Sequence, residues 1–245
     1  TWTEERAKAH VTYVDETGTE HWLFEAFIFW ANLDFKRGGL HFSIVPEGDS
    51  AIKESWLDWI DYWFDEQTGY VKVLDRTIGK AKLRIGEPDF RHSVVATLPT
   101  PIMFKTFADK NSSTVYWGEI DGRQMDFSRL DDQITAFKWM IDQIRAAWDK
   151  VAPKHLDLAG FYVMDEELYC TPESYNYQYK RWDQLLPPIA DYAHSMNYGM
   201  YWIPYYMAPG YEHWKSLGFD MVYMQPNHYW DWAGEKPFDK TIEMV

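Results

Sequence analysis

The sequence predicts an α/β protein of the TIM-barrel-like (β/α)8 type, with about five strand–helix units visible in this chain. Three observations support this prediction. Short apolar runs alternate with longer segments of helical periodicity, an order typical of parallel strands joined by helices. The runs are apolar on both faces, as strands of a buried parallel sheet are. A length of 245 residues suits a single barrel, so we treat residues 1–245 as one domain.

The first predicted elements are an extended segment over residues 10–14 with a turn at 16–19, followed by an aromatic run over 22–30. The run is too short for a typical globular helix, so it predicts a strand buried on both faces. The lead-in before it is interpreted as extended chain or a hairpin. Gly38 and Gly39 then indicate a loop.

Two helices follow from apolar periodicity. Between residues 52 and 64 an apolar side chain recurs every fourth position, with Asp49 or Ser50 as the candidate N-cap. Between residues 130 and 148 the spacing alternates between four and three, and Ser128 resembles the first residue of a capping box.

The other predicted strands and helices complete about five units. Pro187 and Pro188 are expected in the first turn of a helix that continues to Met196, and a short helix is expected around residues 211–217. The remaining strand candidates are residues 94–96, 156–164, 200–206 and 221–224. Only 20 residues follow Gln225, so we expect an incomplete barrel, truncated at its C-terminal side.

The composition excludes several classes of function. The chain has 38 acidic and 24 basic residues, a net charge of −14, and aromatic residues make up 18% of it. Such a charge opposes binding to nucleic acids and to anionic membranes. No apolar stretch is long enough to span a bilayer, and no signal peptide is present. The single cysteine, Cys170, excludes an intrachain disulfide framework and a multi-cysteine zinc site.

Functional groups of parallel α/β proteins collect where strands end, and Asp165, Glu166 and Glu167 directly follow one predicted strand. A carboxylic acid walled by aromatic side chains has a raised pKa, as a general acid that protonates a glycosidic oxygen requires. We therefore select Glu166, with Asp165 beside it. The alternative is a solvated acidic turn that caps the next segment.

Aromatic and amide side chains near other strand ends are candidate ligand-binding groups. Aromatic rings can stack on the C–H faces of sugars, and amides can bond to hydroxyl groups. The alternatives are that the rings belong to the core and that the amides satisfy turn backbone groups. The candidates are Trp117, Tyr162, Tyr205, Tyr206, Gln225 and Asn227.

The sequence lacks the motifs of several other chemistries. It contains no nucleophile elbow, phosphate-binding loop or HExxH pair, and its eight histidines are scattered. A hard-metal site formed by Asp34, Asp165 and Glu166 is a weak candidate. Cys170 is better interpreted as a packed thiol than as a nucleophile. We predict no cofactor and no resident metal.

Four segments together resemble a bacterial family known only as a domain of unknown function, which looks like the (β/α)8 glycoside hydrolases of secreted proteins. The resemblance extends from about Tyr13 to Asn227 and implies a barrel, a carbohydrate-related role, and export to the periplasm or cell surface. The segments are residues 22–27, 160–166, 202–206 with Gly210, and 218–220 leading to 225–227.

The resemblance also implies a role for Glu166, which matches the acidic strand-end position of the family and is therefore the expected acid/base. Strands on which a second carboxylate would be expected have no counterpart before Val245, and Asp34 is our substitute. The leading hypothesis is a glycoside-hydrolase-like protein acting on polysaccharide or oligosaccharide. The rivals are a non-catalytic glycan-binding or surface-assembly domain and a carboxylate–metal hydrolase.

Overall fold

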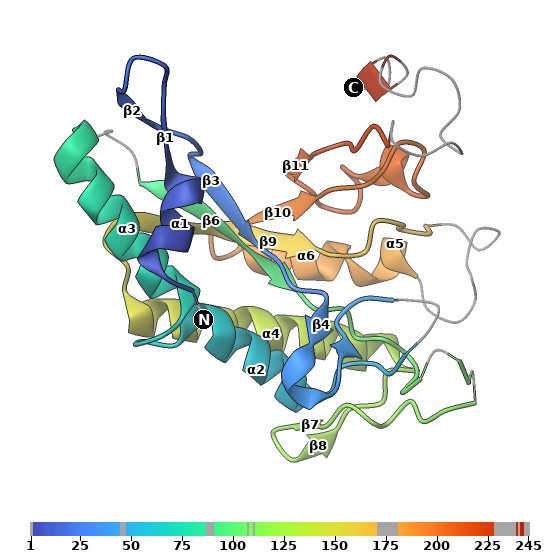
Figure 1. Cartoon of the computed structure of the whole chain (residues 1–245). Coiled ribbons are helices and arrows are strands. Elements are labelled where there is room, and N and C mark those ends of the chain that lie inside the picture. The colour runs from blue at the N-terminus through green and yellow to red at the C-terminus, as the bar shows by residue number, and fades with distance from the viewer. Residues whose placement is uncertain are drawn as a thin grey trace.

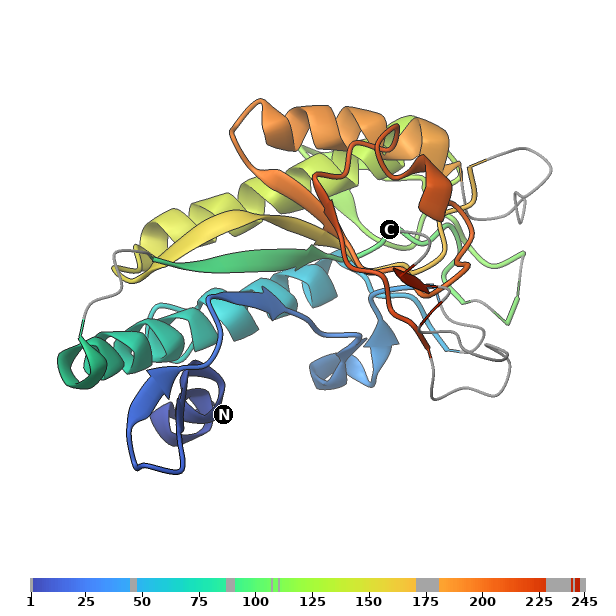
Figure 2. The same cartoon turned by 90° about the horizontal axis from the view of Figure 1, so that it is seen from above.

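The computed structural model describes residues 2–44, 48–86, 91–106, 108–109, 111–170, 181–227, 239 and 241–242. A five-stranded parallel sheet forms its centre, and the strands follow one another in chain order. The sheet curls into a half-barrel (Figures 1 and 2). The strands are β3 (Ala26–Phe29), β6 (His92–Leu98), β9 (Leu156–Val163), β10 (Gly199–Trp202) and β11 (Met221–Val222). This confirms the α/β class and the five parallel strands; the described residues do not form a closed eight-stranded barrel.

Helices connect the consecutive strands, and α2, α3 and α4 lie along one face of the sheet (Figure 1). Two of them join β3 to β6, a single long helix joins β6 to β9, and a pair joins β9 to β10. Only a 3-10 turn, η2 (Tyr211–His213), lies between β10 and β11, where a short α-helix was predicted. The α-helices are α2 (Lys53–Phe64), α3 (Tyr70–Ile85), α4 (Leu130–Val151), α5 (Trp182–Leu185) and α6 (Pro187–His194).

The register of the strands separates the side chains of the two faces. Ala96, Phe161 and Met200 are neighbours across three strands and are almost fully buried. Because successive strand residues point to opposite faces, the next residues along the strands share the other face. That row consists of Thr97, Tyr162 and Tyr201.

The predicted hairpin is confirmed: β1 (Thr12–Val14) pairs antiparallel with β2 (Glu20–Trp22). The single strand predicted over residues 22–30 is wrong, because Trp22 ends β2 and β3 begins at Ala26. Nor is β3 buried on both faces. It is an edge strand of the sheet, whose Phe29 is covered by helix α2 while Ile28 is 36% exposed.

The helix periodicity is confirmed, but the predicted caps are wrong. The N-cap of α2 is Ile52 and that of α4 is Arg129, and neither makes a side-chain cap bond. The hydroxyl of Ser50 instead donates to the carbonyl of Phe104 at 2.6 Å, and that of Ser128 to Asp126 at 2.7 Å. The prolines begin α6 as predicted, although that helix ends at His194.

Three helices were not predicted. They are α3, the four-residue α5, and α1 (Glu4–Val11), which is capped by the side chain of Thr3 and contacts α3. Short antiparallel pairs, β4 (Leu33–Asp34) with β5 (Leu40–His41) and β7 (Glu119–Ile120) with β8 (Arg123–Gln124), lie in the loops after β3 and β6. The 3-10 helix η1 (Phe35–Arg37) ends at Gly38, which has φ +83°. No helix in the described part of the chain is long and apolar enough to cross a membrane.

Candidate functional site

Polar side chains from four loops meet at one end of the half-barrel, because all five strands run in the same direction. The segment after β9 supplies three consecutive acids and a tyrosine. The loops after β6, β10 and β11 supply groups that bond to those acids. We call the following residues the acid cluster: Thr100, Asp165, Glu166, Glu167, Tyr169, Tyr205 and Gln225.

Asp165 is buried and joins several loops. Its carboxylate accepts a hydrogen bond from the hydroxyl of Thr100, after β6, and one from the backbone N–H of Ile44 at 3.3 Å. Its carbonyl accepts a bond from the indole Nε1 of Trp202 on β10 at 2.8 Å. Such a group fixes the positions of its neighbours, so we assign Asp165 a positioning role, whereas the sequence suggested a catalytic one.

Glu167 is held between two phenols. Tyr205 donates to Oε1 at 2.6 Å and Tyr169 donates to Oε2 at 2.9 Å. Burial, and then these bonds to Glu167, raise the pKa of both tyrosines above its ordinary value. Tyr205, a predicted sugar-binding residue, therefore stays protonated and orients Glu167.

Glu166 differs from both neighbours because its side chain is exposed. Its Oε1 accepts a bond from the amide Nε2 of Gln225 at 2.8 Å, and the same amide donates to the carbonyl of Ile203 at 3.0 Å. Backbone bonds to the loop after β10 fix Gln225 in turn. Within the described residues, Oε2 of Glu166 makes no hydrogen bond. Glu166 is thus the acid of the triplet that can reach a ligand, although aromatic side chains do not enclose it as expected.

Tyr162 lies on the sheet face shared with Thr97 and Tyr201 and is buried. Burial first, and then the negative charges of Glu166 and Asp165, raise the pKa of its phenol well above the usual range. The phenol therefore remains a neutral hydrogen-bond donor within electrostatic range of the acid cluster.

Three predicted ligand-binding residues lie in other surroundings. Trp117 is 1% exposed and packs against Trp56 and Phe127, with ring centroids 5.0 and 5.4 Å away, so it belongs to the core. Tyr206 is also buried, and its backbone N–H bonds to the carbonyl of Gln225. Asn227 has a left-handed backbone with φ +51°, which favours the turn interpretation.

The structure does not bring Asp34 into the acid cluster. It follows β3, which β6 separates from β9. Its Oδ1 accepts the backbone N–H of Lys36 at 3.0 Å, and its Oδ2 lies 3.8 Å from Nε of Arg37. Asp34 thus caps η1, and no group of three or more metal-binding side chains gathers in the described part of the chain.

Cys170 donates to the carbonyl of Leu168 at 3.1 Å. Burial, and then the charges of Asp183 and Glu212, raise the pKa of its thiol to about 12. Very little thiolate exists at neutral pH, which favours the interpretation of a packed thiol.

Three participants in the site were not predicted from the sequence: Thr100, Tyr169 and the backbone of Ile44. Thr100 lies between two prolines at the end of a predicted strand, so the strand-end rule was sufficient to find it. Tyr169 follows the acidic triplet by two residues. Ile44 contributes only a backbone N–H, for which its side chain gives no signal.

A family model described as "Domain of unknown function (DUF4855)" matches residues 1–243 of the chain. No curated protein and no solved structure matches this chain.

Proposed function

The chain belongs to the DUF4855 family of domains of unknown function, and from the geometry of the acid cluster we propose that it hydrolyses glycosidic bonds in a polysaccharide or oligosaccharide. Glu166 is the proposed general acid/base. The proposal includes the finer fold assignment, to the (β/α)8 barrels of glycoside hydrolases, and a location in the periplasm or at the cell surface.

One observation carries the proposal: Glu166 is an exposed carboxylate whose position is fixed by a hydrogen bond from Gln225. The Gln225 amide holds one oxygen, and the other is free to approach a ligand. Asp165 and Glu167 are occupied by bonds within the protein. Glu166 lies at the end of a strand, and the amide of Gln225 fixes its position. Gln225 is itself held by backbone hydrogen bonds. A group that protonates a leaving oxygen needs such a fixed position.

In the proposed reaction, protonated Glu166 gives its proton to the glycosidic oxygen as the C–O bond breaks, and its carboxylate then takes a proton from the attacking water. Gln225 keeps the carboxyl group oriented. Asp34 has no role in bond cleavage in this scheme.

The test is a Glu166→Gln variant assayed by reducing-end release on a panel of neutral polysaccharides. The amide keeps the size and the bond to Gln225 but carries no transferable proton, so we expect turnover to fall by about 10²- to 10⁴-fold with ligand affinity retained. Glu5→Gln, an exposed change on α1, is the control. Unchanged turnover in Glu166→Gln would refute the assignment.

A non-catalytic glycan-binding or surface-assembly domain is the second candidate. It is favoured by the occupied state of Asp165 and Glu167, which leaves Glu166 without a second available carboxylate among its immediate neighbours in the chain. In that case the wild-type protein binds glycan but releases no new reducing ends during long incubation.

A further inference from the structure

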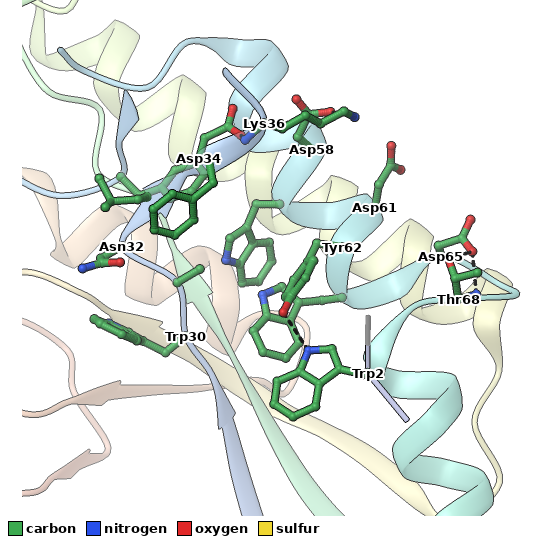
Figure 3. Close-up of a pocket in the computed structure, with 16 residues that line it drawn as sticks. Trp2, Trp30, Asn32, Asp34, Lys36, Asp58, Asp61, Tyr62, Asp65 and Thr68 are labelled. Carbon is green, nitrogen blue, oxygen red and sulfur yellow. Dashed lines mark hydrogen bonds and ion pairs between the residues drawn. The ribbon is translucent and has the colours of Figure 1, made fainter. Parts of the chain in front are cut away.

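A pocket lies apart from the acid cluster, between the loop after β3, helix α2 and the N-terminal Trp2 (Figure 3). It has a volume of about 700 Å³, within the range of sites that bind small molecules. It shares no residue with the acid cluster. We call it the aromatic pocket, because seven of its lining residues are aromatic.

The rim of the aromatic pocket exposes flat ring faces. Trp30, just after β3, and Tyr62, on α2, are each 51% exposed and lie on different sides of the hollow (Figure 3). Nε1 of Trp2 donates to the Tyr62 hydroxyl at 2.7 Å, and the Trp2 ring lies 4.1 Å from that of Tyr70. The rings of Tyr62 and Trp2 are therefore held in place before any ligand arrives.

Three residues that line the pocket carry a buried polar atom that makes no hydrogen bond within the described structure. Trp59 and Trp63 are 3% and 5% exposed, and their indole N–H groups make no hydrogen bond in the described structure. Oδ2 of buried Asp34 accepts no hydrogen bond either, although Nε of Arg37 lies 3.8 Å from it. Three other tryptophans also have unbonded N–H groups, but they do not line this pocket. The lining residues thus hold two donors and one acceptor without a hydrogen bond, and an unbonded polar group is costly to bury.

The charges around the pocket narrow the class of ligand. Burial opposes the ionisation of Asp58, but bonds from Lys36 and Arg37 outweigh it and lower its pKa, so Asp58 is a neutralised anion. Asp61 and Asp65 also line the pocket and are exposed. Lys36 attracts Asp61 and Lys150 attracts both carboxylates, but neither aspartate has an ion pair within 4 Å among the described residues. They oppose an anionic ligand. A simple cation, in turn, has no acceptor for the two indole donors.

We infer that the aromatic pocket is a second glycan-binding site, which takes uncharged sugar rings. A sugar ring has apolar C–H faces for stacking and hydroxyl groups that both donate and accept, and so matches the rim rings and the unbonded atoms together. The ligand class rests on the proposed function, since the same glycan would reach Glu166. The binding itself does not depend on hydrolysis.

Backbone hydrogen bonds fix the position of this pocket relative to the acid cluster. The N–H of Phe42, a pocket residue, donates to the carbonyl of Asn32 at 3.1 Å, and its carbonyl accepts the N–H of Thr100 at 2.7 Å. The Thr100 hydroxyl bonds to Asp165. A glycan chain lying along the strand ends would therefore meet two sites with a fixed relative position, which points to a polymer as the substrate.

The test measures binding by calorimetry with four neutral disaccharides: cellobiose, maltose, mannobiose and N,N′-diacetylchitobiose. We expect at least one to bind, and Trp30→Ala and Tyr62→Ala each to raise its Kd about tenfold. Tyr62→Phe should keep the affinity, since the ring face remains. Phe24→Ala and Tyr13→Ala are matched controls, because these residues are 51% and 46% exposed and do not line the pocket.

Three results would overturn the inference. The first is no binding of any of the four disaccharides at about 10 mM, a concentration that detects millimolar affinity. The second is a Kd that Trp30→Ala and Tyr62→Ala leave unchanged. The third is tighter binding of tetramethylammonium or of a uronic acid disaccharide than of the neutral sugars.

The Glu166→Gln variant separates this inference from the proposed function. If it binds as the wild type does while the rim variants fail, the pocket is a separate site, whether or not hydrolysis is found. If Glu166→Gln alone loses binding, the pocket inference is wrong and the sugar binds at Glu166, while turnover in the reducing-end assay still decides whether Glu166 is the acid/base.

Discussion

The acid cluster and the aromatic pocket both include loops that follow the strands, but they differ in the groups that a ligand would meet. In the acid cluster, phenols, amides and hydroxyls bond to the carboxylates, and Glu166 alone of the three acids is exposed. In the pocket, ring faces are exposed and buried polar atoms remain unbonded. A satisfied network fixes geometry, whereas unsatisfied groups leave interaction energy for a ligand. The first arrangement suits a reacting group and the second suits binding.

The largest expected effect is on stability and distinguishes the pocket floor, formed by the buried Trp59 and Trp63, from the exposed rim. Trp63→Ala should lower the free energy of unfolding by about 3–5 kcal/mol, as truncation of a buried aromatic does. Its ring stacks on Phe29 with centroids 4.6 Å apart. Tyr62→Ala, the adjacent but half-exposed rim residue, should cost about 1 kcal/mol. Urea denaturation measures both, and equal losses would mean that floor and rim do not differ.

The next largest effect, also on stability, distinguishes the buried Asp165 from the exposed Glu166 within the acid cluster. Asp165→Ala should cost about 2–3 kcal/mol, since it leaves the Ile44 N–H and the Thr100 hydroxyl without their partner. Glu166→Ala should change stability by less than about 0.5 kcal/mol, because an exposed side chain is removed. If the two variants are equally stable, Asp165 is not a positioning residue.

The smallest effect is a pH dependence of stability at Tyr162, beside the acid cluster. The folded pKa of Tyr162 lies above its unfolded value near 10, so its contribution is fully present below about pH 10 and is lost as the pH rises further. Tyr162→Phe should therefore make the alkaline fall in stability shallower, by at most about 1.4 kcal/mol per pH unit. Denaturation curves between pH 9 and 11 test this, and parallel curves for both proteins would contradict it.

The sequence was sufficient for the strands and for the acids that follow them. Apolar runs located β6, β9 and β10, and parallel strands necessarily bring their ends together. The aromatic run over 22–30 led to a wrong prediction of one central strand. It contains the end of the hairpin strand β2 and the edge strand β3, and together these have the same apolar composition as a central strand.

The roles within the site were less predictable, because they depend on burial and partners. Nothing in three consecutive acids tells which is enclosed, and only the contacts of Thr100, Tyr205 and Gln225 separate them. The pocket floor was missed for a different reason. The four-residue spacing of Trp56 and Ile60 identified one face of α2, while Trp59 and Trp63 form a neighbouring row with the same spacing.

The hydrogen bond between Ile44 and Asp165 has a consequence for folding. It joins residues 121 positions apart, whereas the hairpin of β1 and β2 closes over fewer than a dozen residues. Contacts between distant residues carry a larger loop-closure entropy and slow the search for the native state. The hairpin can therefore form early and alone, but the acid cluster exists only after β6 and β9 have paired, so the proposed chemistry is among the last properties that the folding chain acquires.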